Sequence, residues 1–516
     1  MVKQIEISLL PEQCFDEATT LLYVKRKSGI ADISGISILK KSLDARKQPI
    51  KFNLLVEVYI QEELPPLSFD FDFKDVHHSP HAIIVGAGPA GLFAALKLIE
   101  GGIKPIIIER GKNVKERRRD LAQITRFNTV NPESNYCFGE GGAGTYSDGK
   151  LYTRSTKRGD VHRILKLLVN HGADERILFE AHPHIGTNKL PHIITAIRET
   201  IEHFGGEVRF NSKLTDILLN GDGIVGVEVN NAEKLKTHQL ILATGHSARD
   251  IFELLHQKSI AIEAKPFALG VRIEHPQALI DQIQYKCEVR DEYLPPASYS
   301  IVNQSLGHGV FSFCMCPGGI IAPAATAPGE IVVNGWSPSK RNNAFANSGL
   351  VVSVQMADLK QYHQFGPLAA LKFQQSVEQK CFAATQSLQA PAQRVADFVN
   401  GKPSTQLPDC SYLPGIQSHA LHEILPNFVG ASLKDALNTF GKKLKGYVTN
   451  EAVMVATESR TSSPVRIPRN KETFEHTQIK GLYPCAEGAG YAGGIVSAAI
   501  DGENCAAQVL RVLKNY

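Results

Sequence analysis

One stretch of the sequence, residues 81–111, constrains the fold more than any other. The segment HAIIVGAGPAGLFAALKLIEGGIKPIIIERG contains an apolar run, a glycine turn, a helical pattern and a second apolar run. Two short apolar runs joined by a helix predict a βαβ unit, in which the strands are parallel and a helix covers one face of their sheet. The sequence therefore predicts an α/β fold.

The glycines of this unit indicate a dinucleotide site. Gly86, Gly88 and Gly91 have the spacing GxGxxG after the first strand and open the helix. Gly86 permits a tight turn, Gly88 lets the backbone approach a pyrophosphate, and Gly91 lets the helix pack against the strand. Glu109 ends the second strand, where a carboxylate accepts hydrogen bonds from ribose hydroxyls and disfavours the 2′-phosphate of NADP.

Motifs far apart in the chain together resemble a known superfamily. VGAGPAGLFAALKLIE with Glu109, the ILATG strand end and YPCAEGAGYAGGIVSAAIDG resemble the FAD-binding segments of glutathione-reductase-type flavoproteins. EGGAGTYSDGKL, FCMCPGG, VVNGWSPSKRNNAFANS and ESRTSSPVRIPR resemble a family of FAD-dependent or NAD-utilising dehydrogenases within it.

The resemblance implies an FAD-dependent oxidoreductase, and the substrate of the family it resembles is unassigned. From the motifs we expect noncovalent FAD and hydride transfer between the flavin and a small, anionic organic substrate. It also implies a set of residues around the cofactor. These are Gly86, Ala87, Gly88, Pro89, Ala90, Gly91, Glu109, Arg110, Gly141, Gly142, Leu214, Thr244, Gly245, Glu487, Gly488, Gly493, Gly494 and Ile495. The last three begin a final helix, whose N-terminus stabilises the negative charge of reduced flavin by ~0.3 to 2 kcal/mol.

We expect the chain to contain a Rossmann-like FAD/NAD(P)-binding domain split in sequence, an inserted mixed α/β substrate domain and a small N-terminal α+β module. We expect the module at residues 1–62, with a helix from Pro11 to Leu22, and a linker at 63–80. The FAD domain is expected at 81–261 and 451–516, with the insert at 262–450. The glycines at 139–144 follow no apolar strand, so we expect no second nucleotide domain, although NADH or NADPH can act as a transient electron donor.

Two cysteines in the insert are candidates for chemistry. Cys314 and Cys316 offer a thiol that is redox-active or attacks the substrate near a flavin. The alternative is that strand alternation points both to one face, where cysteine behaves as a small buried hydrophobe. No second cysteine pair or nearby histidine pair completes four ligands, so no metal is expected.

Charged residues give two further candidate groups. Arg272 and His275, with Glu274 between them, could position and protonate a substrate, or form only a surface ion pair. Arg341, Arg460 and Arg466 offer guanidinium groups for an anionic substrate, or for the FAD pyrophosphate.

Residues 25–51 carry eight Lys or Arg against two Asp, and Arg117 to Arg119 form a second basic run. A solvated face is the ordinary explanation, and a flavin-dependent tRNA-modifying enzyme that contacts nucleic acid there is the alternative. A non-catalytic FAD-binding scaffold or redox sensor is a third interpretation.

Composition bounds the remaining expectations. The net charge of +4 in 516 residues does not by itself favour nucleic acid. Nine scattered cysteines and the absence of long apolar runs indicate a reducing compartment and no membrane partner, so we expect a cytoplasmic protein that acts on a small molecule. The sequence says nothing about its oligomeric state.

Overall fold

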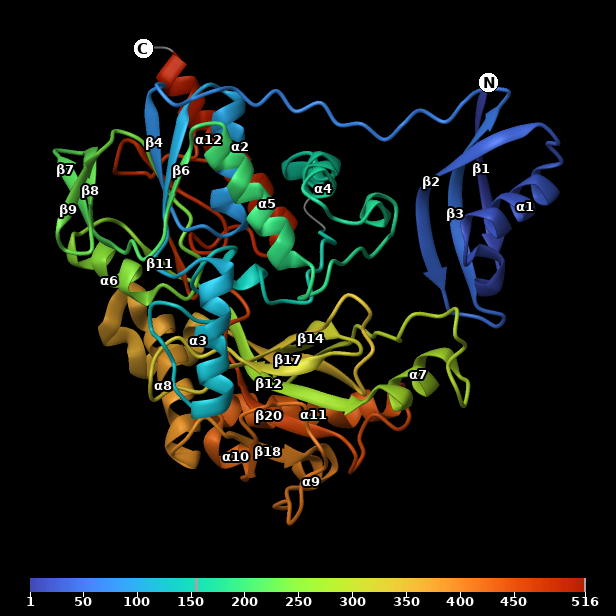
Figure 1. Cartoon of the computed structure of the whole chain (residues 1–516). Helices are drawn as coiled ribbons and strands as arrows, with labels where there is room; N and C mark the ends of the chain where they lie inside the picture. The colour runs from blue at the N-terminus through green and yellow to red at the C-terminus, as the bar shows by residue number, and fades with distance from the viewer. Residues whose placement is uncertain (154–155, 515–516) are drawn as a thin grey trace.

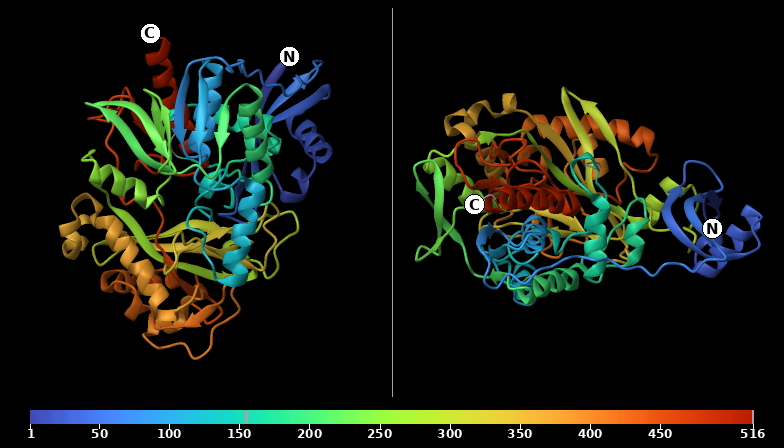
Figure 2. Two further views of the ribbon diagram at one scale, coloured as in Figure 1. Left: turned by 60° about the vertical axis from the view of Figure 1, so that its left-hand side comes forward. Right: turned by 90° about the horizontal axis from the view of Figure 1, so that it is seen from above.

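We describe the protein from a computed structural model, which describes residues 1–153 and 156–514. Figure 1 shows two large layers, one above the other, and a small N-terminal module beside them that a long segment connects to the upper layer. Figure 2 shows from above that the module lies at one end of an elongated molecule.

The upper layer is built on a parallel sheet of five strands in the order β22-β10-β4-β5-β6. Its strands are β4 (His81–Val85), β5 (Lys104–Ile108), β6 (Glu207–Arg209), β10 (Leu240–Leu242) and β22 (Leu482–Pro484). Helix α2 (Pro89–Glu100) connects β4 to β5, so the predicted βαβ unit and parallel sheet are confirmed. Strand β22 comes from the end of the chain and pairs with β10, so distant segments complete this sheet.

Both faces of the parallel sheet are covered, because successive side chains of a strand point to opposite faces. Ala82 and Ile84 pack among helices, and Ile83 and Val85 pack toward a small antiparallel sheet and α6. The helices include α4 (Val161–Asn170), α5 (Leu190–His203), α6 (Arg249–Gln257) and α12 (Ile495–Lys514). The small sheet consists of β7 (Leu214–Asn220), β8 (Gly223–Val229) and β9 (Glu233–Lys236).

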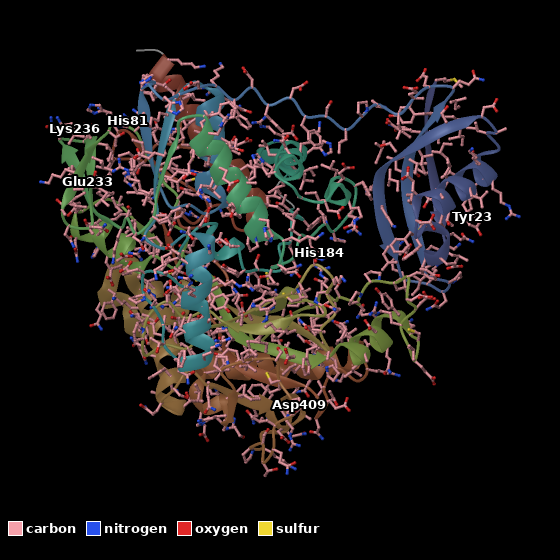
Figure 3. The ribbon with its side chains drawn as sticks, viewed as in Figure 1. Tyr23, His81, His184, Glu233, Lys236 and Asp409 are labelled. Carbon is pink, nitrogen blue, oxygen red and sulfur yellow. The ribbon has the colours of Figure 1, made fainter. Side chains whose placement is uncertain are left out.

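Figure 3 shows the outer edge of this small sheet, where Glu233 and Lys236 lie beside His81 at the start of β4. The His81 ring contacts the carbonyl of Lys236 at 2.8 Å. The contact connects the small sheet to the first strand of the parallel sheet.

The lower layer is a seven-stranded sheet in the order β13-β14-β17-β12-β20-β18-β19. These strands are β12 (Phe267–Pro276), β13 (Val302–Ser305), β14 (His308–Cys316), β17 (Phe345–Val354), β18 (Ala390–Arg394), β19 (Ile416–Ser418) and β20 (Val453–Glu458). Helices α8 (Ala369–Thr385) and α11 (Asn427–Lys443) contribute buried side chains to the same core as the sheet. The pairing is antiparallel except between β18 and β19.

Strand β20 differs from the expected division of the chain. The sequence analysis placed residues 451–516 with the FAD domain, but β20 lies between β12 and β18 in the seven-stranded sheet. The run Val453–Glu458 is buried at every position. A fully buried apolar strand is compatible with the centre of either the five-stranded or the seven-stranded sheet. The sequence pattern of β20 therefore does not indicate to which of the two sheets it belongs.

The N-terminal module is a three-stranded sheet, β1 (Val2–Leu9), β3 (Lys51–Ile60) and β2 (Ile33–Asp44), with helix α1 (Glu17–Ser28) against it. The predicted helix from Pro11 to Leu22 is wrong in its bounds. Asp16 caps the true helix by accepting a hydrogen bond from the Thr19 N–H, and residues before it form only a short 3₁₀ turn. Strand β2 was not predicted, because its polar run ILKKSLD resembles a loop.

The module contacts both layers. The Lys41 N–H donates to Phe179 O at 2.8 Å, and the Ala181 N–H donates to Lys41 O at 2.9 Å. The Gln48 side chain donates to Tyr285 O at 2.7 Å. Strand β2 and the following loop therefore bridge the two layers.

The remaining elements connect these parts. They are α3 (Val114–Phe127), β11 (Glu263–Ala264), α7 (Gln277–Tyr285), β15 (Ile320–Pro323), β16 (Val333–Trp336), α9 (Val395–Asn400), α10 (Leu421–Ile424), β21 (Val465–Arg466) and 3₁₀ segments at Pro11–Cys14, Gly142–Gly144, Thr156–Arg158, Glu175–Leu178 and Met356–Leu368. Within residues 1–153 and 156–514, none of the helices has the length and apolarity that a bilayer span requires.

Candidate functional site

A cavity lies between the two layers. On the upper side, residues of the segments 85–90, 108–110, 137–150, 212–214, 243–251 and 486–498 line it. On the lower side, Phe313, Cys314, Asn334, Gly335, Arg460 and Thr461 line it. Most of the upper segments follow the carboxyl ends of the parallel strands, which is where open α/β sheets bind ligands.

Glu109 fixes the upper wall of the cavity. Its carboxylate accepts backbone N–H bonds from Ala87, Gly111 and Gly139, each at 2.9 Å, and the residue is 5% exposed. A carboxylate has about four acceptor positions, so about one remains for a ligand hydroxyl. Glu109 therefore holds three loops together and can accept one bond from a ribose hydroxyl.

The glycine turn brings helix α2 close to its strand. A Cβ at Gly91 would lie 1.9 Å from Gly86 O, so no side chain fits between the helix and the turn. At Gly88, by contrast, the nearest atom to an added Cβ is Gly142 Cα at 4.0 Å. A Cβ at Gly142 would lie 3.2 Å from Gly88 Cα, so the two backbones approach closely. Together they form a part of the cavity wall without side chains, along which a pyrophosphate can lie.

Arg117 holds the second glycine loop in place. The residue is fully buried, and its guanidinium donates to the carbonyls of Asn135, Tyr136, Glu140 and Gly142 at 2.8 to 2.9 Å. The sequence analysis placed Arg117 in a basic run available to nucleic acid. That interpretation is wrong for Arg117, since its guanidinium is committed to the loop carbonyls.

Most of the residues expected at the cofactor line this cavity. Those on the cavity wall are Gly86, Gly88, Pro89, Ala90, Glu109, Arg110, Gly142, Leu214, Thr244, Gly245, Glu487, Gly494 and Ile495. The other five, Ala87, Gly91, Gly141, Gly488 and Gly493, do not line it. His246 also lines the cavity but was not predicted; its Nδ1 lies 3.4 Å from a carboxylate oxygen of Glu487.

These residues fit a flavin adenine dinucleotide. Helices α2 and α12 both begin at the cavity, so two sets of free N–H groups and two positive dipole ends face it. The side-chain-free wall at Gly88 and Gly142 lies beside the start of α2, and the Glu109 carboxylate lies at the end of β5. An extended, anionic ligand with a ribose is the kind of group that this arrangement holds.

Asp148 and Lys150, which were not predicted, carry charge from the upper segment 137–150 to the lower end of the cavity, where Arg341 joins them. Lys150 Nζ lies 3.1 Å from Asp148 Oδ2, and Arg341 NH2 lies 2.6 Å from the same carboxylate oxygen. Burial opposes ionisation, but Lys150 and Arg341 hold the pKa of Asp148 well below its usual range. The available signal was the SDGK segment of the family resemblance, which was used only for its glycines.

The two candidate cysteines do not share a strand face. The pairing of β14 shifts register between Phe313 and Cys316, and Cys314 has a φ of +46°. This bulge interrupts the alternation, so Cys314 is exposed at the cavity and Cys316 is buried. Cys316 Sγ lies 3.3 Å from Arg272 NH2 and 3.6 Å from Lys150 Nζ.

The Arg272–His275 segment is buried, which corrects the expectation of a surface ion pair. Arg272 is fully buried; it pairs with Glu458 at 3.0 Å and donates to Cys314 O at 2.6 Å. His275 contacts Tyr447 O at 2.8 Å, and burial lowers its pKa to about 4. Neither side chain lines the cavity, but Arg272 fixes the backbone at Cys314.

The structure does not bring the three arginines of the substrate prediction together. Only Arg460 lines the cavity, and its guanidinium is engaged by Glu378, Glu330 and Thr326. Arg341 lies behind the wall on Asp148, and Arg466 is half exposed on β21. Figure 3 marks His184 near this region, and its ring contacts Ser339 O at 3.1 Å.

A cluster of Cys485, Asp501 and Cys505 is the group of possible metal ligands found in the described part of the chain. Arg469 donates to both oxygens of Asp501, at 2.7 and 2.8 Å. A guanidinium that occupies the carboxylate in this way takes the place of a cation, so these residues do not fit a metal ion.

Family comparisons agree with this geometry. Residues 80–254 match the family model described as "Pyridine nucleotide-disulphide oxidoreductase", and residues 266–461 match "FAD-dependent protein, C-terminal domain-like". Residues 1–59 match a domain of unknown function, DUF8436. An uncharacterised protein of Clostridium beijerinckii is 41% identical over 503 residues, which cover 93% of each chain.

Solved structures show a more distant likeness. The tetracycline destructase Tet(51) is 11% identical, covers 85% of this chain and 83% of its own, and has a TM-score of 0.36. The halogenase PltM is 12% identical with 85% and 70% coverage and a TM-score of 0.37. A geranylgeranyl bacteriochlorophyll reductase-like protein of Thermoplasma acidophilum is 12% identical with 85% and 80% coverage and a TM-score of 0.35. Similarity at this level does not extend to the reaction.

The matched domains and the cavity together define a flavoprotein with the domains of an FAD-dependent oxidoreductase. Within that class, the chain belongs to the same family as the Clostridium beijerinckii protein, which matches it along nearly its whole length.

Proposed function

We propose that the protein transfers a hydride between noncovalently bound FAD and a small, anionic organic substrate. One observation carries the proposal: a single cavity joins the dinucleotide-type residues of the upper layer to Cys314, Asn334 and Gly335 of the lower layer. A ligand held along the upper wall leaves the lower end of the same cavity for a second, small molecule.

Each part of the upper wall has a role in this proposal. Glu109 holds the loops and accepts a hydrogen bond from a ribose hydroxyl, and the pyrophosphate lies along the side-chain-free wall at Gly88 and Gly142. The first turn of α12 stabilises negative charge on the ring system. The flavin supplies the chemistry of hydride acceptance and donation when it is bound.

NADH or NADPH is proposed only as a transient electron donor. A resident nicotinamide domain needs a second parallel sheet with its own glycine turn. In the described part of the chain, the five-stranded sheet is the one with the strand, glycine turn and helix in this order. A nicotinamide would therefore enter the shared cavity and leave it.

The test is an anaerobic titration of the purified protein with NADH and with NADPH, followed at the flavin band at about 450 nm. Bleaching supports a nicotinamide-driven reductase, and a band that persists supports a dehydrogenase that its own substrate reduces. Absence of a flavin band in the folded protein contradicts the proposal.

A pair of variants checks the site assignment. Gly88→Leu places a large side chain on the cavity wall beside Gly142, where the pyrophosphate would lie, and should abolish flavin retention. Gly223→Leu is the control, since its added Cβ meets nothing closer than 3.7 Å and lies in β8 away from the cavity. A folded Gly88→Leu protein that keeps its full flavin content would overturn the placement of the pyrophosphate.

A further inference from the structure

The lower end of the cavity has one cation that is not fully committed to protein partners. Three Lys or Arg side chains in the described residues line the cavity: Arg110, Lys150 and Arg460. Arg110 pairs with Asp250 and Glu133, and Arg460 is held by two glutamates and a threonine.

Lys150 is different because it shares its carboxylate. Asp148 pairs with both Lys150 and Arg341, so two positive charges face one negative charge. An ammonium has three donors, and those of Lys150 meet Asp148 at 3.1 Å and the weak acceptor Cys316 Sγ at 3.6 Å. At least one donor and a net positive charge therefore remain for a ligand.

Cys314 is held next to this cation in an unusual backbone conformation. Its φ of +46° lies in the left-handed region, which side chains with a Cβ seldom adopt. Arg272 fixes this conformation, because its guanidinium donates to Cys314 O at 2.6 Å. An ion pair with Glu458 holds the guanidinium itself in place. Non-glycine residues held in this way concentrate at functional sites, and here the result is a thiol exposed at the cavity.

The side-chain amide of Asn347, next to the cavity wall, has an unpaired donor among the described residues. Asn347 is fully buried; its Oδ1 accepts from Arg272 at 2.8 Å, and its Nδ2 has no partner among the described residues. An added Cβ on the cavity-lining Gly335 would lie 2.3 Å from that Oδ1, so the amide packs directly behind the glycine. A polar donor thus lies just behind this end of the cavity.

We propose that Lys150 and Cys314 form the subsite for an α,β-unsaturated carboxylate, with Lys150 binding the carboxylate and Cys314 transferring a proton at the carbon next to it. The hydride step rests on the proposed function, but carboxylate binding beside the thiol does not. In the reductive direction the S–H bond breaks and a C–H bond forms with electrons of the C=C bond. Reduced flavin, when bound, would supply a hydride to the other carbon of the former C=C bond. Water would then reprotonate the Cys314 thiolate.

The surroundings of Cys314 suit a proton donor. Although the side chain is exposed at the cavity, desolvation by the surrounding protein raises the pKa of its thiol, and Cys316 and Glu458 act in the same direction. Lys150 and Arg272 oppose this shift but do not cancel it. The group is therefore a neutral thiol at pH 7, which is the form that donates a proton.

The test compares two alkylating reagents on the flavin-loaded protein. Iodoacetate carries a carboxylate next to its reactive carbon, and iodoacetamide is its neutral counterpart. In both cases the thiolate forms an S–C bond, the C–I bond breaks and iodide leaves. Mass spectrometry of the peptides measures labelling rates at Cys314 and at Cys137, which lines the same cavity elsewhere.

We expect the ratio of iodoacetate to iodoacetamide rates to be about tenfold higher at Cys314 than at Cys137, and saturable in iodoacetate. Lys150→Met should lower the ratio at Cys314 to the ratio at Cys137. Because Lys150 also lowers the pKa of the Cys314 thiol, the variant should slow both reagents at Cys314, and the ratio of the two rates removes that common effect. Lys112→Met is the matched control, since Lys112 pairs with Asp120 at 2.9 Å and does not line the cavity.

Three results would overturn the inference: equal ratios at the two cysteines, a preference that survives Lys150→Met, or a Cys314 that neither reagent labels. The labelling does not require turnover, so its outcome is separate from that of the nicotinamide titration. If the nicotinamide titration bleaches the flavin but the alkylation shows no selectivity, the proposed function stands and the carboxylate subsite is wrong. If labelling is selective but no donor reduces the flavin, the carboxylate subsite stands and the proposed function is wrong.

Discussion

At the scale of single residues, the site depends on side chains that serve the backbone. Glu109 and Arg117 hold loops by accepting or donating several main-chain hydrogen bonds, and Arg272 fixes the bulge at Cys314. Buried charged groups with all partners satisfied are costly to disturb, because the partners lose their hydrogen bonds as well. The geometry of the cavity therefore depends on residues that a ligand never touches.

Buried histidines make the stability of the protein depend on pH. Burial lowers the pKa of His275 to about 4, against an ordinary value of about 6.5 in the unfolded chain. The unfolded state then binds more protons below pH 6.5, so the free energy of unfolding falls as the pH falls from 6.5 toward 4. We expect His275 to account for a loss of about 2 kcal/mol between pH 7 and pH 5.

The measurement is urea unfolding at both pH values for the wild type and His275→Gln. The variant should be less stable at pH 7 but should lose about 2 kcal/mol less on acidification. His256→Gln, on the surface of α6, is the control and should keep the wild-type pH dependence. An identical pH dependence in the wild type and His275→Gln would show that His275 is not the group responsible.

At the scale of elements, the cavity depends on how closely α12 approaches α2. A Cβ at Gly502 of α12 would lie 2.1 Å from Ala90 O in the first turn of α2. Both helices begin at the cavity, so a shift of one relative to the other moves the two N-termini that face the ligand.

We expect Gly502→Ala to destabilise the protein by about 1 to 3 kcal/mol and to weaken flavin retention, because the helices must separate. Gly430→Ala, in α11, is the matched control: its Cβ meets nothing closer than 3.7 Å. A helical Gly→Ala change without a clash stabilises by about 0.5 to 1 kcal/mol. Thermal unfolding measures the stability of each variant, and the flavin absorbance of the purified protein measures retention. Equal stability and equal flavin content in the two variants would contradict the close packing of α12 on α2.

At the scale of the whole molecule, buried charges connect the two layers. Arg249 on α6 of the upper layer pairs with Glu330 at 2.6 Å and with Glu378 on α8 of the lower layer. Arg460 contacts the same two glutamates. Burial opposes ionisation of Glu378, but Arg249 and Arg460 lower its pKa to about 2.

Arg249→Met should cost about 3 to 5 kcal/mol of unfolding free energy, because it leaves two buried carboxylates with one arginine. Lys372→Met is the matched control, since Lys372 on α8 pairs with Glu253 on α6 at 2.7 Å across the same boundary but is partly exposed. Exposed pairs contribute about 0 to 1 kcal/mol. Urea unfolding measures the free energy of unfolding of both variants. Similar losses in the two would show that burial does not determine how strongly these ion pairs hold the two layers together.

The sequence by itself determined the parallel βαβ unit, the glycine turn and Glu109. These features are local: the apolar period, the glycine spacing and the acid after the strand all lie within about thirty residues. The family resemblance added Thr244, Glu487 and the start of α12, because motif order carries information that periodicity does not.

Only the tertiary structure decided the rest. The bulge that separates Cys314 from Cys316 arises from register against β17, and the burial of Arg272 arises from β20, which lies next to β12 although nearly 200 residues separate them in sequence. Lys150 reaches the lower layer through a loop whose path depends on contacts with Asp148 and Cys316. Long-range pairing and burial are sums over many distant contacts, so a local pattern does not contain them.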